Sequence, residues 1–237
     1  MPHPVNQTHP RKVDGLLRAL LPLRCLVCEE PGSQGLDLCP ECRAALPWNH
    51  AACARCALPL PRAAPRCGRC AGLALPQASA RAVFLHAAPV DQLHRRLKFH
   101  GELAAGRLLG QLLAESLAAA PRPQALAWLP LHRSRLRRRG YDQALELARP
   151  LARALDLPLL AGRLHRRRAT AAQSELDAAA RRRNVRGAFA VRPGPPLPAH
   201  IALFDDVMTT GATLQEAARA LRQAGVARVD LWALARA

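Results

Sequence analysis

The stretch IALFDDVMTTGATL, residues 201–214, places two adjacent carboxylates between an apolar run and a turn of threonine and glycine. Its first four residues predict a buried strand, and the apolar spacing over residues 213–224 predicts a helix that Gly225 terminates. Two like charges repel one another at the rim of a hydrophobic core. The pair Asp205 and Asp206 therefore indicates a binding site.

Apolar runs and helical periodicity alternate along the chain from about residue 80 onward. Short runs without polar alternation are typical of parallel strands buried on both faces, whereas leucines at helical spacing predict amphipathic helices. The alternation predicts an α/β domain with a largely parallel sheet flanked by helices. The predicted strands are 81–86, 125–131, 188–191, 201–204 and 227–236, and the predicted helices are 93–117, broken near Gly101, 141–155 and 213–224.

Ligands of such sheets bind beyond the carboxyl ends of the strands, where the following helix begins. Main-chain N–H groups and threonine hydroxyls at a helix N-terminus bind phosphate, and Gly211 allows the backbone to approach closely. The two carboxylates suit the vicinal hydroxyls of a sugar, or a divalent metal. A sugar phosphate satisfies both halves of the motif, and a helix-capping pair followed by a plain turn is the alternative. The residues predicted to contact such a ligand are Asp205, Asp206, Val207, Met208, Thr209, Thr210, Gly211, Ala212 and Thr213.

The chain carries 35 lysines and arginines against 17 acidic residues, a formal net charge of +18. This charge favours polyanionic partners such as phosphorylated metabolites or nucleic acid, and a solvated basic surface produced by arginine-rich coding is the alternative. Aromatic residues make up only 3% of the chain, so phosphate contacts would dominate over base stacking. No apolar run is long enough to span a bilayer, and residues 1–20 lack the apolar core of a signal peptide. We therefore expect a cytoplasmic protein without membrane insertion.

All eight cysteines fall between residues 25 and 70, as four CxxC pairs that begin at a constant interval of 14 residues. Two thiolates on one tight turn can reach one ion, and two such turns complete a tetrahedral zinc site. The pattern predicts two structural zinc sites, with the turns paired either sequentially or in an interleaved order. A disulfide framework is the alternative, and a cytoplasmic setting argues against it. The predicted zinc ligands are Cys25, Cys28, Cys39, Cys42, Cys53, Cys56, Cys67 and Cys70.

The motif IALFDDVMTTGAT resembles the phosphoribosyl-diphosphate (PRPP) binding motif of type I phosphoribosyltransferases. Together with the cysteine array, it resembles the ComF/GntX family of competence-associated, phosphoribosyltransferase-like proteins, which carry a double zinc ribbon. Three further segments are similar to that family: RLKFHG, LPLHRSRLRRRGYDQALELA and RRRATAAQSELDAAARRRNVRGAF. The chain departs from the family pattern at Ala57, where the family has glycine, at Trp128, where it has proline, and at Asp142, where it has asparagine.

The resemblance implies a phosphoribosyltransferase-like domain at residues 78–237, a double zinc ribbon at 25–72 and a separate segment at 1–24. It implies PRPP with Mg²⁺ as the ligand, with the acidic pair on the ribose hydroxyls and the threonine-glycine turn on the 5′-phosphate. Further contacts implied in this way are Leu131, His132 and Arg133 around the pyrophosphate, Lys98, and Gln173 in a mobile hood of residues 163–173.

The resemblance also implies a function. One interpretation is a phosphoribosyltransferase of unknown acceptor that supports DNA uptake in natural transformation, or ribose-phosphate metabolism. The second is a non-catalytic accessory factor of the DNA-uptake machinery, which senses PRPP or binds single-stranded DNA and has a DNA-translocation helicase as its partner. A third is a zinc-stabilised nucleic-acid binder with a vestigial transferase fold, which the intact acidic pair disfavours.

Overall fold

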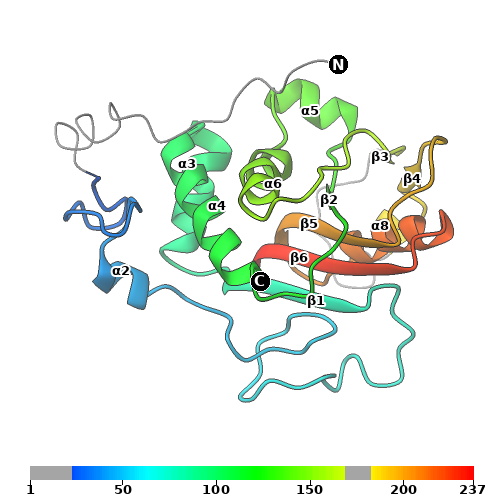
Figure 1. Cartoon of the computed structure of the whole chain (residues 1–237), viewed down its shortest axis with the longest axis horizontal. Helices are drawn as coiled ribbons and strands as arrows, with labels where there is room; N and C mark the ends of the chain where they lie inside the picture. The colour runs from blue at the N-terminus through cyan, green and yellow to red at the C-terminus, as the bar shows by residue number, and fades with distance from the viewer. Residues whose placement is uncertain (1–22, 169–182) are drawn as a thin grey trace. The chain divides into compact units, whose positions relative to one another are not determined.

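The computed structural model describes residues 23–168 and 183–237 (Figure 1). The chain forms two compact units, Met1–Ala45 and Leu46–Ala237. The smaller unit holds the first two CxxC turns and the short helix α2 (Pro40–Ala44), which the thiol of Cys39 caps. The larger unit holds the other two CxxC turns and the α/β domain. The boundary between the units therefore falls between the two halves of the cysteine array.

The central sheet of the larger unit has four strands, in the order β1-β6-β5-β2. Each pair of neighbours is parallel, which confirms the predicted α/β architecture. The two central strands bury most of their residues, because helices cover both of their faces. The strands are β1 (Ser79–Leu85), β2 (Ala125–Trp128), β5 (His200–Met208) and β6 (Arg228–Arg236).

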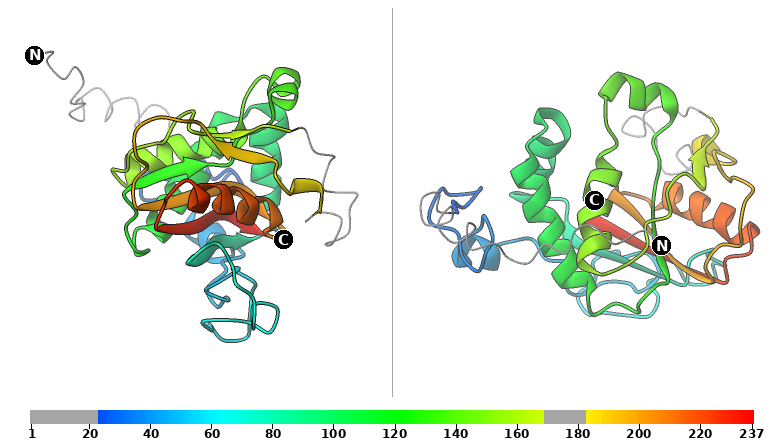
Figure 2. Two further views of the ribbon diagram at one scale, coloured as in Figure 1. Left: turned by 90° about the vertical axis from the view of Figure 1, so that its right-hand side faces the viewer. Right: turned by 45° about the horizontal axis from the view of Figure 1, so that its top comes forward.

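Helices lie on both faces of this sheet (Figure 2). One face carries α8 (Ala212–Gln223), whose Leu214 joins Ile201 and Leu203 of β5 in one buried cluster. Side chains alternate along a strand, so Ala202 and Phe204 point to the other face. That face carries α3 (Val90–His100), α4 (Leu103–Leu117) and α6 (Gln143–Ala154). None of the described helices is long and apolar enough to cross a bilayer.

Glycines in the left-handed conformation set the ends of two helices. Gly101, with φ of 65°, ends α3 and separates it from α4, which confirms the predicted break. Gly140, with φ of 85°, ends a short helix α5 (Arg133–Arg139) that the sequence did not predict. This helix buries none of its residues, so it has no apolar periodicity from which it could be recognised.

Strand β5 is longer than predicted, and the expectation that it ends at Phe204 is wrong. It continues to Met208, and Asp205, Val207 and Met208 pair with β6. Acidic residues are rare in strands, so the apolar pattern stops at the charges although the main-chain pairing does not. Outside the central sheet, β3 (Leu164–Arg166) and β4 (Phe189–Val191) form an antiparallel pair of which only β4 was predicted.

The segment that leads into the third CxxC turn lies along the outer edge of β1. Main-chain hydrogen bonds join the two at Pro47 and Leu85 (2.7 Å), at Asn49 and Val83 (2.9 Å), and at Ala54 and Ala80 (2.8 Å). Ala57, in the turn itself, is fully buried in the same cluster as residues of the sheet. The second half of the cysteine array is therefore built onto the sheet and covers its edge strand.

Candidate functional site

The acidic pair lies in the carboxyl-terminal half of β5, near the centre of the sheet. Strand β2 runs parallel beside it, with Trp128 opposite Phe204. The loop of residues 131–133 therefore leaves the sheet at the same edge as the turn of residues 209–211. The structure thus brings the predicted pyrophosphate loop, the acidic pair and the threonine-glycine turn together at the carboxyl ends of the strands.

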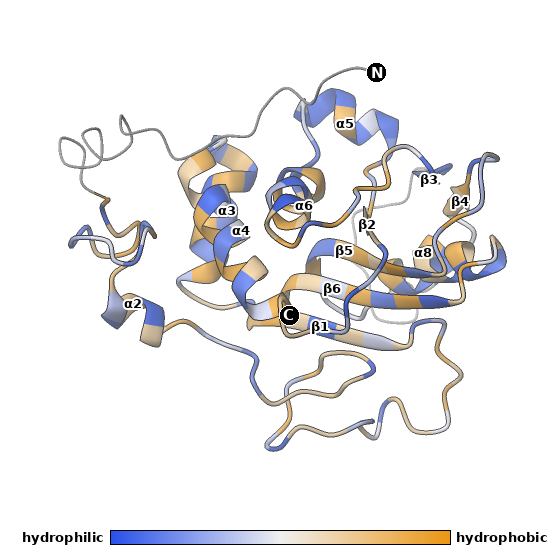
Figure 3. Cartoon of the chain, in the orientation of Figure 1, coloured by the Kyte–Doolittle hydropathy of each residue, from blue (hydrophilic) through white to orange (hydrophobic). Residues whose placement is uncertain are grey.

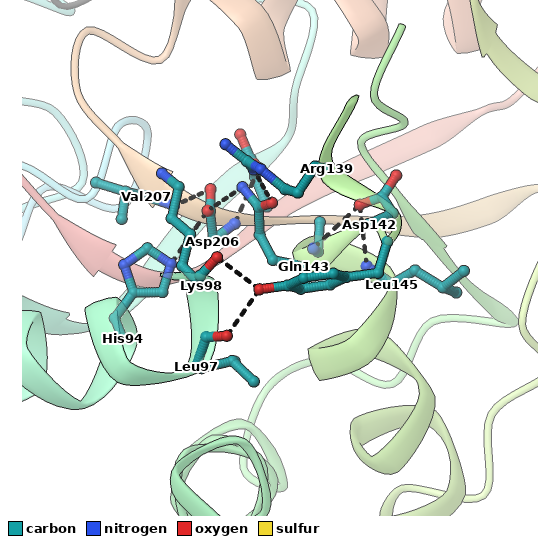
Figure 4. A network of polar contacts seen from close by, with 12 residues as sticks. His94, Leu97, Lys98, Arg139, Asp142, Gln143, Leu145, Asp206 and Val207 are labelled. Carbon is teal, nitrogen blue, oxygen red and sulfur yellow. Dashed lines mark hydrogen bonds and ion pairs between the residues drawn. The ribbon is translucent and has the colours of Figure 1, made fainter. Parts of the chain in front are cut away.

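Asp205 and Asp206 are successive residues of one strand, so their side chains point to opposite faces of the sheet. Asp206 faces α3 and α6 (Figure 4). Its Oδ2 lies 3.1 Å from Nε2 of His94 and accepts a hydrogen bond of 2.8 Å from Nε2 of Gln143. Arg139 donates in turn to Gln143. Asp206, His94 and Gln143 are all buried, so partners from two helices hold this carboxylate in place.

The pKa values of the two carboxyl groups are shifted in opposite directions. Burial by itself would raise the pKa of Asp206, but the hydrogen bond from His94 and the charge of His94 outweigh this effect. Lys98 and Gln143 add to this effect and keep the pKa of Asp206 well below its usual range. Burial and the negative charge of Asp206 raise the pKa of Asp205 well above its usual range. Asp205 is therefore the member of the pair that a cation or a ligand hydroxyl would stabilise most.

Asp205 is half-buried, and its Oδ1 accepts the N–H of Asp206 at 2.9 Å. Across from it, the guanidinium of Arg166 in β3 lies 5.3 Å from the centre of the Phe189 ring. Burial and the charge of Arg135 lower the pKa of Arg166 to about 10, and the charge of Asp205 opposes this shift. Arg166 is thus a basic side chain of the site, although the sequence analysis gave it no role of its own.

The turn after β5 leads directly into α8. Gly211 has φ of 76°, in the left-handed region that favours glycine, and it provides no side chain to cap the helix. The hydroxyl of Thr210 accepts the N–H of Ala212 at 3.3 Å. The first N–H groups of a helix carry partial positive charge. An anion held by this turn would therefore be stabilised by the partial positive charge of the helix start.

Tyr141 holds the carboxyl-terminal turn of α3. Its hydroxyl lies 2.8 Å from the carbonyl oxygen of Leu97 and 2.5 Å from that of Lys98. These contacts hold the last turn of α3, from which the charge of Lys98 lowers the pKa of Asp206. The structure therefore brings Lys98 near Asp206, as Figure 4 shows.

Asp142 positions the loop that follows β2. Its Oδ2 accepts the N–H of Leu131 at 3.0 Å, and its Oδ1 caps α6 by accepting the N–H of Ala144 at 3.1 Å. Burial raises the pKa of Asp142, although these N–H groups and a hydrogen bond from the Trp128 side chain oppose the shift. Trp128 and Asp142, two positions at which the chain departs from the family pattern, line the same pocket.

A pocket of about 660 Å³ adjoins this loop rather than the acidic pair. His132 caps α5 there, with its Nδ1 accepting the N–H of Ser134 at 3.3 Å, and Arg133 is the first residue of that helix. The lining includes Trp128, Leu131, His132, Arg133, Tyr141 and Arg166.

The eight cysteines form two separate sets, Cys25/Cys28/Cys39/Cys42 and Cys53/Cys56/Cys67/Cys70, and in each set the sulfur atoms lie within 4.8 Å of one another. A tetrahedral zinc ion with Zn–S bonds of about 2.3 Å separates its sulfurs by about 3.8 Å. The Sγ atoms of Cys28 and Cys39 are 3.6 Å apart, and those of Cys56 and Cys67 are 3.7 Å apart. Both sets therefore fit zinc, and the turns pair sequentially rather than in the interleaved order.

Main-chain N–H groups of the CxxC turns favour thiolates. Burial by itself would raise the pKa of Cys25, but hydrogen bonds from N–H groups of the surrounding turns outweigh this effect and lower the pKa to about 6. The same balance lowers the pKa of Cys53 to about 7. Burial and neighbouring thiols instead raise the pKa of Cys42 and Cys70. Bound zinc would stabilise all four thiolates of a set, because its positive charge compensates the negative charges of the crowded sulfur atoms.

The sequence analysis missed several polar residues of the site, and one predicted residue is not described. Gln173 and the hood beyond residue 168 lie outside the described residues. His94 occupies the buried stripe of α3 together with Val90, Leu93 and Leu97. A titratable side chain on an apolar stripe is a signal that could have been used. Gln143 lay in a segment similar to the family, but nothing in the local pattern links it to a residue more than 60 positions away.

Comparison with known proteins supports these structural features. A model of the double zinc ribbon domain matches residues 16–71. This match, the parallel sheet and the two four-cysteine sites together define an α/β protein that carries a double zinc ribbon. Competence protein F of Haemophilus influenzae is 39% identical over 157 residues, which are 63% of this chain and 69% of that protein.

DNA utilization protein YhgH of Escherichia coli strain K12 is 33% identical over 220 residues, covering 90% of this chain and 89% of that protein. Competence protein ComFC of Streptococcus pneumoniae is 29% identical and covers 67% of this chain and 68% of its own length. The chain belongs to the ComF/GntX family, with these competence and DNA utilization proteins. Among solved structures, adenine phosphoribosyltransferase of Leishmania donovani aligns with 58% of this chain and 68% of its own, at 14% identity and a TM-score of 0.30, which is too distant a likeness to carry an argument.

Proposed function

We propose that the carboxyl end of β5 binds PRPP, or a related ribose 5-phosphate, together with Mg²⁺. We propose further that the protein is a cytoplasmic phosphoribosyltransferase that supports DNA uptake. The observation that carries the proposal is one strand–turn–helix unit that presents a carboxylate pair and a helix start with glycine at the N-cap, at the end of the strands where parallel sheets bind ligands. The names of the relatives, competence protein and DNA utilization protein, support the role in DNA uptake.

In this proposal the chain acts mainly by positioning and electrostatics. N–H groups and hydroxyls of residues 209–213 bind the 5′-phosphate. Asp205 contacts the ribose hydroxyls and offsets the positive charge that develops on the sugar as pyrophosphate leaves. Asp206, which His94 and Gln143 hold from the other face, supports the position of the strand end and adds negative charge. The loop of residues 131–133 binds the pyrophosphate.

The residues of the site fit Mg²⁺, which prefers oxygen ligands. Asp206 uses both carboxylate oxygens in contacts with His94, Gln143 and the N–H of Val207. Asp205 uses only Oδ1, so Oδ2 has no hydrogen-bond partner among the described residues. Bound Mg²⁺ would supply positive charge to the pyrophosphate that departs.

A second candidate is a non-catalytic factor that senses PRPP through the same residues and acts in DNA uptake with a translocation helicase. The net charge of +18 favours contact with nucleic acid. The two candidates differ in one measurement, because only the transferase releases pyrophosphate from PRPP when an acceptor is present. A screen of bases and amines for acceptor-dependent pyrophosphate release separates them.

Calorimetric titration with PRPP and Mg²⁺ tests the site itself. Asp205→Asn should weaken binding at least tenfold, because it removes the carboxylate that faces the ligand while keeping its shape. Asp156→Asn, at an exposed position outside the site, is the matched control and should bind as the native protein does. Absence of heat with native protein, or equal affinity of the Asp205→Asn variant, contradicts the proposal.

Thermal unfolding of the same variant separates lost binding from lost folding. A carboxyl whose pKa is raised by folding destabilises the folded state above its unfolded pKa, and this cost disappears as the pH falls. Asp205→Asn should therefore stabilise the protein at pH 7 by about 1 kcal/mol, with a smaller gain near pH 4. Asp206→Asn should have the opposite sign and cost about 3 kcal/mol at pH 7, because it leaves a buried pair broken.

A further inference from the structure

A buried arginine connects the second zinc ribbon with the end of β5. Arg236 is 6% exposed, and it is the one arginine that is buried in the parts of the chain that the structure describes. It belongs to β6, where it pairs with Met208 at the end of β5 and with Leu85 at the end of β1. Burial of a guanidinium is costly unless its charge and its N–H groups find partners. The groups around Arg236 therefore indicate its role.

The guanidinium of Arg236 holds the end of β5. Its Nη1 donates to the carbonyl oxygen of Met208 at 3.0 Å and also to the main-chain oxygen of Ala237. The N–H of Ala237 donates to the same Met208 oxygen at 3.0 Å. Nε of Arg236 is buried and has no hydrogen-bond partner among the described residues. The hydrogen bonds of this side chain are therefore concentrated on the last carbonyl groups of β5 and of the chain.

The carbonyl of Met208 is directly connected to the threonine-glycine turn. It belongs to the same planar peptide unit as the N–H of Thr209, the first residue of that turn. Donors that fix the Met208 oxygen therefore fix the direction of the Thr209 N–H, and they polarise it into a stronger donor. The Met208 side chain supports the turn as well, because a Cβ added at Gly211 would lie 3.7 Å from its Sδ. Arg236 thus acts on the proposed phosphate site through Met208.

The second ribbon acts on Arg236 in turn. Burial lowers the pKa of Arg236, whereas the charges of Cys56 and Cys67 oppose this shift. Ala57, the residue after Cys56, belongs to the same buried cluster as Met208. Four thiolates and one Zn²⁺ together carry two negative charges. A zinc ion held by this set of cysteines would therefore leave a negative centre that stabilises the buried guanidinium.

The two ribbons differ in this respect. The cysteines of the first ribbon belong to the unit Met1–Ala45, whereas the second ribbon, Arg236 and Met208 belong to the unit Leu46–Ala237. The cysteine charges that act on Arg236 come from the second set. The first ribbon therefore provides an internal control that has the same ligand chemistry.

We propose that Arg236 is a positioning residue that couples the second zinc site to the turn of residues 209–213. The zinc–thiolate centre stabilises the guanidinium, the guanidinium holds the carbonyl of Met208, and Met208 orients the start of the turn. Zinc in the second ribbon therefore raises the affinity of the turn for a 5′-phosphate, whereas zinc in the first ribbon does not. The inference rests on the proposed PRPP site for its ligand and adds a metal-dependent control of that site.

The coupling can be measured in the native protein, because coupling between two binding sites is reciprocal. Equilibrium competition with a chelator of known zinc affinity gives the affinity of each zinc site with and without saturating PRPP and Mg²⁺. PRPP should tighten one of the two sites about fivefold or more and leave the other unchanged. Cys25→Ser, which keeps only the second set intact, should retain this effect, and Cys53→Ser should lose it. Chelation of zinc by free PRPP would loosen both sites and so has the opposite sign.

Variants of Arg236 test the residue itself. Arg236→Met removes the charge and should weaken the second zinc site about tenfold, as is typical of groups that support metal ligands. Calorimetry should show PRPP binding about tenfold weaker in the same variant. Arg236→Lys keeps the charge and should recover most of both affinities. The matched control is Arg81→Met at an exposed position of β1, which removes one positive charge and should leave both affinities unchanged.

The outcomes separate the coupling from the proposed function. Tightening of one zinc site by PRPP, with loss in Arg236→Met and recovery in Arg236→Lys, supports the coupling. A native chain that binds PRPP with no change at either zinc site contradicts the coupling alone, as does equal weakening in Arg236→Met and Arg81→Met. Absence of PRPP binding by the native chain contradicts the proposed function and the coupling together. If thermal unfolding shows that Arg236→Met is not folded, Arg236→Lys and the native competition decide the matter.

Discussion

The two zinc ribbons share one ligand pattern and differ in what surrounds it. In both, the residue after the first CxxC pair adopts the left-handed conformation, with φ of 68° at Glu29 and 55° at Ala57. In both, the N–H of that residue donates to the carbonyl of the first cysteine, at 2.9 Å for Glu29 and 2.8 Å for Ala57. Yet Glu29 is exposed in the small unit, whereas Ala57 is buried in the core of the α/β domain. Ligand spacing therefore determines the conformation of the cysteine turn and does not determine how a ribbon is attached.

Hydrogen bonding outside the ligand turns accounts for this difference. The second ribbon follows a segment that pairs with the edge strand β1 (Figure 1). Figure 3 shows the mixed polar and apolar character of this part of the chain, which lacks the continuous apolar pattern of the central strands. Bound zinc would therefore supply much of the folding energy of the second ribbon, and hydrogen bonds to the edge strand β1 attach this ribbon to the sheet. Three predictions test the comparison.

Loss of zinc should affect the two ribbons unequally. Cys53→Ser and Cys25→Ser should each leave one zinc ion per chain by metal analysis. Cys53→Ser should lower the unfolding temperature of the α/β domain by about 10 °C in scanning calorimetry, because the second ribbon contributes to its core. Cys25→Ser should shift that transition by less than about 2 °C. Equal shifts for the two variants would mean that the first ribbon supports the α/β domain as strongly as the second.

Removal of one link between ribbon and sheet should have a smaller effect. Nδ2 of Asn49 donates to the carbonyl oxygens of Ala57 at 3.0 Å and Ala82 at 3.3 Å. Asn49→Ala removes both hydrogen bonds and should reduce the free energy of unfolding by about 2 kcal/mol, measured by urea denaturation. Gln92→Ala, at an exposed position on α3, is the control and should change it by less than about 0.5 kcal/mol. If both variants have the same stability, Asn49 does not join the ribbon to the sheet.

Glycine at the two left-handed positions should give the smallest effect and should again distinguish the ribbons. Glu29→Gly removes a backbone cost of about 1 kcal/mol without loss of packing, so the first ribbon should retain its zinc better against a chelator. Ala57→Gly removes the same cost but also a buried methyl group worth about 0.8 kcal/mol, so stability should change little. A clear gain in chelator resistance from Ala57→Gly would show that its methyl group does not contribute to packing.

Much of the fold follows from patterns that are local in the chain. The apolar run before Asp205 and the helical spacing after Gly211 predicted a strand and a helix, and both are present. The extra length of β5 could not be predicted, because its last residues are held by pairing with β6. Helix α5 could not be predicted either, because it buries no residue. Each of these misses arises where main-chain hydrogen bonds, rather than side-chain burial, define the element.

In the candidate site, too, the local pattern was predictable from the sequence and the long-range contacts were not. The residue types of the acidic pair and of the threonine-glycine turn were sufficient to indicate a ligand. The contact of Asp206 with His94 joins residues 112 positions apart, and the opposed pKa shifts of the two carboxyls depend on that contact. No spacing rule relates such distant positions, since burial depends on which helix packs on which face of the sheet.

The sequence by itself determined the zinc ligands, the parallel α/β architecture and the place of the carboxylates beside a glycine turn, because each depends on residues close together in the chain. Only the tertiary structure decided that the CxxC turns pair sequentially and that the second ribbon is attached to β1. It also decided that Asp205 and Asp206 point to opposite faces and that His94 and Gln143, from two different helices, contact Asp206. These features depend on long-range pairing, in which segments far apart in the chain meet because together they bury apolar surface and satisfy main-chain hydrogen bonds.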